Sequence, residues 1–404
     1  MKINKKICIM GMGYIGLPTG ALLAREGYEV HGVDIDSRII DTVNRGEIHL
    51  IEPGLDALVA SAVENELLSA HFDPCEADVF IIAVPTPFHS NKADHFKKSP
   101  VPNVDFIINA VKNILSYIRS GNLILLESTS PVGTTDMIAD ILKKEGVDVD
   151  SIFIAYSPER VLPGCIIAEL IQNDRVVGGI NNKSTKKAAE FYRTFVKGMV
   201  CETMANTAEM VKLTENAFRD VNIAFANELS ILCDDLNINV GELISLANRH
   251  PRVDILTPGC GVGGHCISVD PWFIVDNANG KARLIEQARR TNDNKAEWVN
   301  SKIKNTVLNF ENIHGVKPTV CCMGLAFKPN IDDLRESPAL HIAITLQKEF
   351  NVVAVEPNIK QHDYIQLVDF KKGLKSDICV YLVSHKQFKA NFIKEDDLDF
   401  CGIN

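Results

Sequence analysis

Several features that mark other classes of protein are missing from this sequence of 404 residues. No apolar run approaches the roughly 20 residues of a membrane-spanning helix. The net charge of -10 argues against an extended surface for nucleic acid. The eleven cysteines include no CxxC pair and no Cys/His spacing typical of zinc, so no metal site is expected. Their odd number and the absence of a secretory segment predict reduced thiols and a cytoplasmic protein.

Helix-like and strand-like stretches alternate along most of the chain, and this rhythm predicts an α/β protein. In the first part, short strands are expected at residues 7–10, 28–33, 79–84, 123–126 and 152–155. In the last part, a smaller set is expected at residues 320–323, 352–355 and 378–383, with a helix at 337–348. Strands that alternate with helices form doubly wound parallel sheets. The sequence therefore predicts two Rossmann-like domains.

A long central helix is predicted between these two regions. From Thr207 to about Leu236 few helix-breaking residues occur, and apolar residues recur every three or four positions. This apolar face consists of Met210, Leu213, Ala217, Val221 and Ala224. The helix could join the two domains and pair with a second subunit. We expect a Rossmann-like domain at 1–200, a central helical domain at 201–310 and a second Rossmann-like domain at 311–404.

A glycine-rich motif, Gly11-Met12-Gly13-Tyr14-Ile15-Gly16, follows the first predicted strand and opens the first predicted helix. Asp34 stands 18 positions after Gly16, at the end of the second predicted strand. In a dinucleotide site, such glycines let the pyrophosphate approach the helix N-terminus. Asp34 would accept hydrogen bonds from the adenosine ribose and repel a 2′-phosphate, so NAD is expected rather than NADP. A purely structural glycine turn is the alternative.

Two further segments, Ala83–Pro87 and Glu127–Pro131, lie just after predicted strands. Ligands of open α/β sheets bind outside the carboxyl ends of the strands. Thr86 and Thr129 are therefore candidate contacts to the ribose or nicotinamide of the cofactor. Each could instead be an ordinary turn or cap residue.

Cys266 stands in the glycine-rich run Gly261-Val262-Gly263-Gly264-His265-Cys266, whose backbone can approach a ligand closely. A nicotinamide cofactor alone supports one hydride transfer, from alcohol to carbonyl. A cysteine nucleophile would trap the carbonyl as a thiohemiacetal, which a second oxidation converts to a thioester that water hydrolyses. The pair predicts a four-electron oxidation of an alcohol to a carboxylate. Cys260 is a rival nucleophile, and Cys266 or His265 could be structural.

Lys212, Asn216 and Arg219 are four and three residues apart, so they project from one side of the predicted central helix. A lysine partly removed from water beside other cations has a lowered pKa and can act as a base or stabilise an oxyanion. Asp270 follows Cys266 by four residues and could orient a hydrolytic water or pair with Lys212. A solvated polar face is the alternative interpretation of this stripe.

Basic residues gather in three predicted loops of this acidic chain. The first contains Arg160, the second contains Arg249 and Arg252, and the third contains Lys328 and Arg335. Arginine binds phosphate groups with two parallel hydrogen bonds, so these loops could hold a diphosphate-linked substrate. Isolated surface charges are the alternative.

Taken together, the chain resembles the UDP-glucose/GDP-mannose dehydrogenase family from Ile7 to about Phe388. The segments that carry the resemblance are Gly13-Tyr14-Ile15-Gly16-Leu17-Pro18, Arg45-Gly46-Glu47-Ile48-His49, Ala83-Val84-Pro85-Thr86-Pro87-Phe88, Glu159-Arg160-Val161-Leu162-Pro163-Gly164, Lys212-Leu213-Thr214-Glu215-Asn216, Arg219-Asp220-Val221-Asn222, Ala247-Asn248-Arg249-His250-Pro251-Arg252, Asp270-Pro271-Trp272-Phe273, Gly324-Leu325-Ala326-Phe327-Lys328-Pro329 and Asp333-Leu334-Arg335-Glu336-Ser337. The resemblance implies an N-terminal NAD domain, a long helix used in homodimerisation, and a C-terminal domain that helps hold a nucleotide sugar. Family members oxidise C6 of the sugar to a carboxylate with two NAD per turnover, and the products generally supply cell-surface polysaccharides.

By position, the resemblance makes Cys266 the nucleophile and Lys212 the general acid/base, with Asn216, Glu159 and Asp270 nearby. Lys212 and Asn216 would also contact the substrate. The other residues that resemble substrate contacts are Arg160, Val161, Arg219, His250, Arg252, Gly263, Phe327 and Lys328. The residues that resemble cofactor contacts are Tyr14, Ile15, Asp34, Thr86, Thr129 and Arg335, in addition to the glycines Gly11, Gly13 and Gly16.

The identity of the sugar is suggested by departures from the family pattern. Glucose-specific members typically have Ser before the nucleophile and Lys before the aspartate, where this chain has His265 and Val269. The resemblance therefore implies a UDP-N-acetylhexosamine. Trp272-Phe273 and the His250-Pro251-Arg252 loop favour UDP-N-acetylmannosamine, with its C2 epimer UDP-N-acetylglucosamine as the alternative. Cys260 replaces a proline often found in N-acetylhexosamine members. A two-electron dehydrogenase and a non-catalytic binding protein are the remaining alternatives.

Overall fold

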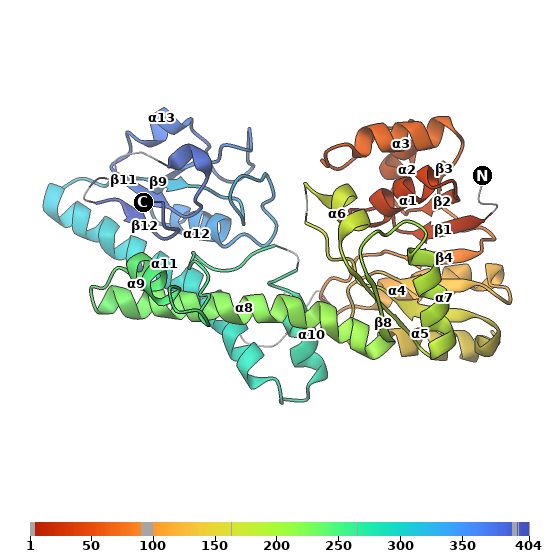
Figure 1. Cartoon of the computed structure of the whole chain (residues 1–404). Coiled ribbons are helices and arrows are strands. Elements are labelled where there is room, and N and C mark those ends of the chain that lie inside the picture. Colours follow the sequence, from red (N-terminus) through yellow and green to blue (C-terminus); the bar gives the residue numbers. More distant parts are fainter. Residues whose placement is uncertain are drawn as a thin grey trace. The chain divides into compact units, whose positions relative to one another are not determined.

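The computed structural model describes residues 5–89, 100–162, 164–264, 266–389, 394 and 396–403. The chain forms two compact units, which divide inside helix α8 (Ala205–Asp235), between Thr214 and Glu215. Figure 1 labels the elements of both units. Within the described ranges, no helix combines the length and the apolar character needed to cross a membrane.

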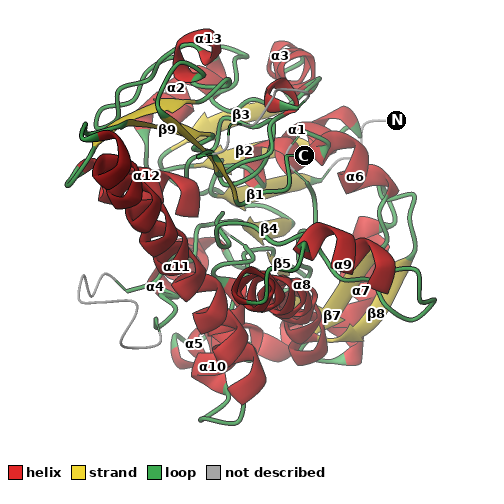
Figure 2. Cartoon of the chain, turned by 90° about the vertical axis from the view of Figure 1, so that its left-hand side faces the viewer, coloured by secondary structure: helices red, strands yellow, loops and turns green. Residues whose placement is uncertain are grey.

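Unit 1, which ends at Thr214, is built on an eight-stranded sheet. The strands are β1 (Lys6–Met10), β2 (Glu29–Val33), β3 (Leu68–His71), β4 (Val79–Ile82), β5 (Leu123–Leu126), β6 (Phe153–Tyr156), β7 (Arg175–Gly179) and β8 (Val200–Met204). Their order is β3-β2-β1-β4-β5-β6-β7-β8, and Figure 2 shows β3 to β5 in succession. Neighbouring strands run parallel except β6 and β7, which are antiparallel. Five strands confirm those expected from the sequence, whereas β3, β7 and β8 were not anticipated.

Helices cover both faces of this sheet. They are α1 (Gly16–Arg25), α2 (Ser37–Asn44), α3 (Leu55–Glu64), α4 (Asp105–Ile114), α5 (Thr134–Lys144), α6 (Ile166–Gln172) and α7 (Asn182–Tyr192), with short 3-10 turns at Leu115–Tyr117 and Val149–Ser151. Because side chains alternate along a strand, Ile7 and Ile9 of β1 enter one core and Cys8 and Met10 enter the other. The first core includes residues of α1, α2, α3, α6 and α7, and the second includes residues of α4 and α5.

Helix α8 confirms the predicted central helix, and Figure 1 draws it as one unbroken green ribbon. Leu213, Ala217 and Ala224 of the predicted apolar face are buried, whereas Met210 is 40% exposed. The helix carries the chain from the first unit into the second. It therefore fixes the spacing between any residues that it bears on the two sides of the division.

Unit 2, which begins at Glu215, contains a four-stranded parallel sheet of order β10-β9-β11-β12. Its strands are β9 (Thr319–Met323), β10 (Asn351–Val355), β11 (Ile378–Tyr381) and β12 (Leu398–Asp399). Its further helices are α9 (Val240–Ala247), α10 (Asp270–Asn277), α11 (Arg283–His314), α12 (Pro338–Gln347) and α13 (Phe370–Gly373), with a 3-10 turn at Lys386–Phe388. One face of α11 and one of α12 pack in the core beneath the sheet.

The predicted fold class is thus confirmed: a large, mostly parallel α/β sheet and a second parallel sheet, with a long helix between them in sequence. The separation of the later residues into a helical domain at 201–310 and a Rossmann-like domain at 311–404 stays a prediction.

Candidate active site

The glycine loop of unit 1 connects β1 to α1, and two of its glycines are required by the protein itself. Gly11 has a φ of +97°, and its N–H donates to the Val33 carbonyl at 2.8 Å. A Cβ at Gly11 would lie 2.6 Å from the Ala83 carbonyl oxygen, and one at Gly16 would overlap the Gly11 carbonyl. Any larger residue at either position would therefore push the loop off the end of the sheet.

Gly13 has a different reason to be glycine. A Cβ at Gly13 would meet no protein atom within 4 Å, so packing does not explain it. The space faces the start of α1, where the N-cap residue Ile15 provides no side-chain hydrogen bond to the free N–H groups. An open helix N-terminus with room for close approach fits the pyrophosphate of NAD.

Asp34 is fixed beside this loop. Its Oδ2 accepts a hydrogen bond from the Met12 N–H at 2.9 Å, and its Oδ1 accepts one from the Asp36 N–H at 3.0 Å. The carboxylate stays partly exposed, as does Ile15, and Tyr14 is 46% exposed. The structure therefore places the predicted cofactor contacts of the first βαβ unit at one edge of the sheet.

Thr86 and Thr129 follow the neighbouring strands β4 and β5. The Thr86 hydroxyl donates to the Thr129 carbonyl at 2.7 Å, and the Ser128 hydroxyl donates to the Val84 carbonyl at 2.7 Å. These bonds join the two segments at the carboxyl ends of their strands, where ligands of such sheets bind.

The segment after β6 carries Glu159, Arg160 and Val161. The Arg160 N–H donates to Glu159 Oε1 at 2.7 Å, and the Arg160 guanidinium donates to the Asp174 carbonyl. Val161 packs against the hydrophobic core. Downstream, the Gly164 N–H donates to the buried Glu52 carboxylate at 2.7 Å, so this segment is anchored to the body of unit 1.

A buried ionic cluster lies behind Glu159, and sequence reasoning missed it. Arg175 Nη2 is 2.9 Å from Glu159 Oε2 and 3.1 Å from Glu127 Oε1, and Tyr192 donates to Glu127 at 2.7 Å. Burial raises the pKa of Glu127 above its ordinary value, although the Arg175 charge opposes this. No sequence motif relates these residues, which come from separate elements.

On α8, the residues of the predicted polar stripe have different surroundings. Lys212 is 8% exposed, and no residue that the structure describes forms a hydrogen bond or ion pair with its ammonium group. Asn216 donates to Asp270 Oδ2 at 2.6 Å, whereas Arg219 is exposed. Because Lys212 is largely buried, it is not explained as part of a solvated face.

The glycine-rich run of unit 2 packs against the segment after β9. A Cβ at Gly263 would lie 2.8 Å from Phe327 Cβ, and one at Gly264 would lie 2.8 Å from the Phe327 ring. The Gly264 N–H also donates to the Arg335 carbonyl at 3.1 Å. The structure therefore brings together three residues that the sequence proposed for substrate or cofactor binding, namely Gly263, Phe327 and Arg335.

Cys266, at the end of this run, is exposed and forms no disulfide, whereas His265 lies outside the described residues. The Cys266 carbonyl accepts the Asp270 N–H at 2.8 Å, in the turn that starts α10. Asp270 itself is 2% exposed and receives the Asn216 amide. The hydrogen bonds thus connect α8, Asp270 and the backbone of Cys266 within unit 2.

Cys260, the rival nucleophile, has a very different environment. Its side chain belongs to the core of unit 2 and is 6% exposed. Burial raises the pKa of the Cys260 thiol to about 12. Since the thiolate is the reactive form, Cys260 is poorly suited to be a nucleophile near neutral pH.

A second buried network ties both ends of the glycine-rich run to the helices. The Arg289 guanidinium donates to Asp220 and, at 3.4 Å, to the Ile267 carbonyl next to Cys266. Asn292 donates to Asp220 at 2.8 Å, and Asn227 accepts the Gly259 N–H at 2.9 Å. Burial raises the pKa of Asp220 to about 6 even though Arg289 opposes the shift. None of these residues was assigned a site role from the sequence.

The remaining predicted substrate contacts lie on exposed loops of unit 2. His250 and Arg252 follow α9, with the Arg252 N–H 3.4 Å from His250 Nδ1. Lys328 is exposed, and the Arg335 guanidinium pairs with Asp333 at 2.6 Å. His250, Arg252 and Lys328 are exposed, as contact with an anionic ligand requires.

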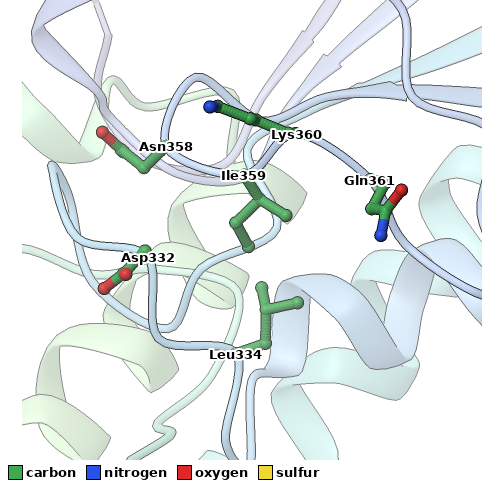
Figure 3. A pocket seen from close by; sticks show the side chains of 6 residues that line it. All are labelled: Asp332, Leu334, Asn358, Ile359, Lys360 and Gln361. Atoms are coloured by element: carbon green, nitrogen blue, oxygen red, sulfur yellow. The ribbon is translucent and has the colours of Figure 1, made fainter. Parts of the chain in front are cut away.

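An open hollow also lies at the carboxyl ends of β9 and β10, and none of the predicted site residues lines it. Its lining residues are Asp332, Leu334, Asn358, Ile359, Lys360 and Gln361. In Figure 3, Ile359 and Leu334 face one another across it.

The glycine loop, the open N-terminus of α1 and Asp34 define unit 1 as the dinucleotide-binding part of an oxidoreductase. Models of the UDP-glucose/GDP-mannose dehydrogenase family match the chain as NAD binding domain (residues 5–196), central domain (206–294) and UDP binding domain (321–397). The chain belongs to this family. It is therefore an NAD-dependent nucleotide-sugar dehydrogenase, which confirms the expected cofactor and substrate class.

Relatives and solved structures agree with this assignment along the whole chain. A UDP-N-acetyl-D-mannosamine dehydrogenase of Campylobacter jejuni is 52% identical over 402 residues, which cover 95% of this chain and 96% of the relative. An NDP-N-acetyl-D-galactosaminuronic acid dehydrogenase of Ralstonia nicotianae is 48% identical over 401 residues, which cover 95% of this chain and 92% of the relative. The structure of a UDP-D-ManNAc dehydrogenase from Pyrococcus horikoshii has a TM-score of 0.87 at 35% identity, covering 99% of this chain and 96% of that chain.

Proposed function

We propose that the protein oxidises UDP-N-acetyl-D-mannosamine at C6 to UDP-N-acetyl-D-mannosaminuronate, a four-electron reaction that uses two NAD. The observation that carries the four-electron chemistry is the contrast between two cysteines of one loop. Cys266 is exposed, whereas Cys260 is buried with its pKa raised to about 12. An exposed thiol in this glycine-rich loop supports the covalent intermediate that a second oxidation requires.

The proposed reaction begins with proton removal from the C6 hydroxyl by Lys212 or by a water that it holds. NAD, when bound, accepts a hydride from C6, once in each of the two oxidation steps. The Cys266 thiolate attacks the aldehyde carbon, and Lys212 with Asn216 stabilises the resulting oxyanion. The burial of Lys212 supports this role, because charge stabilisation is stronger away from water.

The last step is hydrolysis of the thioester that the second oxidation leaves on Cys266. A water activated by Glu159 or Asp270 attacks the carbonyl carbon, the carbon–sulfur bond breaks, and the carboxylate and the Cys266 thiolate are released. The hydrogen bond between Asn216 and Asp270 supports a shared role for these two side chains.

The choice of sugar rests on the relatives that are named for N-acetylmannosamine and on the His265 and Val269 positions. UDP-N-acetylglucosamine is the alternative expected from the sequence. A galacto-configured sugar is a further candidate, because a relative of 48% identity is named for N-acetylgalactosaminuronic acid. UDP-N-acetylglucosamine differs from UDP-N-acetylmannosamine only at C2, and UDP-N-acetylgalactosamine differs from it at C2 and C4, so a direct measurement is needed.

The NADH yield per sugar tests the chemistry and the substrate together. UDP-N-acetylmannosamine, UDP-N-acetylglucosamine, UDP-N-acetylgalactosamine and UDP-glucose are supplied separately with excess NAD. We expect two NADH per UDP-N-acetylmannosamine and little from the others. Two NADH from another sugar would keep the mechanism and overturn the substrate. One NADH per sugar, or a Cys266→Ser variant that still released uronate at the normal rate, would overturn the thioester mechanism.

We also propose that the protein is a homodimer that pairs through α8. Phe218, Phe225 and Leu232 recur every seven residues on this helix and are 68%, 53% and 50% exposed. An exposed apolar stripe at this spacing is typical of helix pairing. Phe218→Ser with Phe225→Ser should yield a monomer in sedimentation velocity, whereas the control Glu64→Ser, an exposed position on α3, should not. A double variant that stayed dimeric would show that the subunits pair elsewhere.

We further propose a cytoplasmic enzyme whose uronate product feeds a surface polysaccharide. None of the eleven cysteines, all of which lie within the described residues, forms a disulfide, which supports a reducing compartment. Loss of the protein should deplete uronate residues from the polysaccharide of the producing cell, and an unchanged composition would contradict this role.

A further inference from the structure

The buried cluster behind Glu159 joins four elements of unit 1. Glu127 follows β5, Ser157 and Glu159 follow β6, Arg175 begins β7, and Tyr192 ends α7. Arg175 alone contacts both carboxylates, at 3.1 Å from Glu127 and 2.9 Å from Glu159. One guanidinium thus lies between two acids.

The guanidinium is itself held from three sides. Its Nε donates to the Ser157 hydroxyl at 2.9 Å, and its plane lies over the Tyr192 ring with 4.3 Å between Cζ and the ring centroid. Tyr192 in turn donates to Glu127 at 2.7 Å. Arg175, Glu127 and Tyr192 are all at least 95% buried. Because its planar guanidinium is held by these contacts, Arg175 has little freedom to change its position or orientation.

Burying these ionisable groups costs folding free energy, so we expect the cluster to have a function. The cluster places two carboxyl groups around one guanidinium away from water. Glu127 Oε2 has no hydrogen-bond partner among the described residues, and Glu159 Oε2 has only the ion pair with Arg175. Apolar residues would fill the same space at lower cost. Of the two acids, Glu159 is the one that stands on the segment with the predicted substrate contacts Arg160 and Val161, so it is the acid that Arg175 can position for the reaction.

We propose that Arg175 is a positioning residue for catalysis: held by Glu127, Ser157 and Tyr192, it orients the Glu159 carboxylate to take a proton from the hydrolytic water. This inference rests on the proposed function and selects Glu159 over Asp270 for that step. The water proton moves to Glu159, the water oxygen bonds to the thioester carbon, and the bond to Cys266 sulfur breaks. Neither hydride transfer needs Arg175.

The test measures which reaction step becomes slower in Arg175→Lys. This variant keeps the positive charge but loses the planar guanidinium and its fixed set of N–H donors. We expect a normal first burst of two NADH per active site, followed by turnover that is slower by on the order of 100-fold. Intact-protein mass spectrometry should then find the sugar acyl group on Cys266. The surface variant Arg193→Lys, whose side chain pairs with Glu202 in solvent, is the matched control and should behave as the parent protein.

A double-mutant cycle separates positioning from a merely structural role. If Arg175 acts through Glu159, then Arg175→Lys should add almost nothing to Glu159→Gln, because residues of one network are not additive. Independent, additive losses, or equal slowing of both hydride steps, would overturn the inference. If Arg175→Lys does not fold, Tyr192→Phe gives a milder version of the test, and absence of any acyl accumulation there would count against it.

The two hypotheses fail in different ways. If Glu159→Gln accumulates no acyl-enzyme, then Glu159 is not the water-activating base and the proposed function needs correction. If Glu159→Gln accumulates it and Arg175→Lys does not, then only the positioning role of Arg175 is wrong.

Discussion

The two parallel sheets of this protein begin in the same way and then diverge. Gly11 follows β1 with a φ of +97° and donates to Val33 at 2.8 Å, and Gly324 follows β9 with a φ of +95° and donates to Val355 at 2.8 Å. An acidic residue follows the second strand of each sheet and accepts hydrogen bonds from the loop backbone. The local plan of a dinucleotide-binding turn is thus present twice.

The difference lies in what these acids and loops leave open. Asp34 is partly exposed, whereas Glu356 is 5% exposed and accepts from the Leu325 and Ala326 N–H groups and from His385 at 3.1 Å. In the first sheet α1 starts at Gly16, but in the second α12 starts only at Pro338. The comparison teaches that a shared backbone turn does not make a cofactor site. The site needs a free carboxylate and an uncovered helix N-terminus.

Removing the partner of Glu356 should have the largest effect on stability. In His385→Ala, a buried carboxylate loses its charged or polar partner, and the free energy of unfolding should fall by about 3 kcal/mol. Urea unfolding at pH 7 measures this loss. The exposed His341→Ala is the control. Unchanged stability in His385→Ala would mean that the second acid is not structural.

The Glu356 and His385 pair also predicts how the stability of the protein depends on pH. Although burial raises the pKa of Glu356, the His385 hydrogen bond and the Leu325 and Ala326 N–H groups lower it below the ordinary 4.5. A lowered folded-state pKa contributes stability above the ordinary value, and that stability is lost as the pH falls through the folded-state value. The parent protein should therefore lose stability below about pH 4.5 through Glu356. His385→Ala should lose less over that range.

Two glycine variants should separate NAD binding from thermal stability, because each is expected to change only one of the two. Gly13→Val should keep the melting temperature, because its Cβ meets no protein atom within 4 Å, yet weaken NAD binding by on the order of 100-fold. Gly324→Ala should do the reverse, since its Cβ would lie 2.5 Å from Val383 Cβ. Calorimetric titration with NAD and thermal unfolding measure both. A fall in melting temperature for Gly13→Val would contradict the open space at that position.

The smallest effect is expected from neutralising Asp34. Asp34→Asn should keep a hydrogen bond from the Met12 N–H, lower NAD affinity by about tenfold, and relax the discrimination against NADP. Glu356→Gln, the counterpart in the second sheet, should change neither affinity. Dissociation constants for NAD and NADP in the two variants make the measurement. A loss of NAD affinity in Glu356→Gln would show that the two sheets are less different than proposed.

Features that depend on short spacing could be predicted from the sequence. The glycine loop with Asp34, the long central helix and the glycine-rich run before Cys266 are all visible as local patterns, and the structure places each as an element or loop of the expected kind. Local patterns suffice here because turns and helices form from residues a few positions apart.

Features that depend on burial could not be predicted. The Glu127 and Arg175 pair and the Asp220 and Arg289 pair join residues 48 and 69 positions apart, and a charged residue in a sequence is normally expected at the surface. From the sequence, only the family resemblance ranked Cys266 over Cys260. The physical difference between them, an exposed thiol and a buried one in the same glycine-rich loop, needed the fold.

The unbroken helix α8 has a consequence for anyone who wishes to divide the protein into fragments. The units divide inside it, between Thr214 and Glu215. A cut there would sever a run of i to i+4 backbone bonds and expose four N–H and four C=O groups at the new ends. It would also separate Lys212 from Asn216, which one helical turn now keeps in register. Split or chimeric versions should therefore be joined before Ala205 or after Asp235, so that the helix passes intact to one partner.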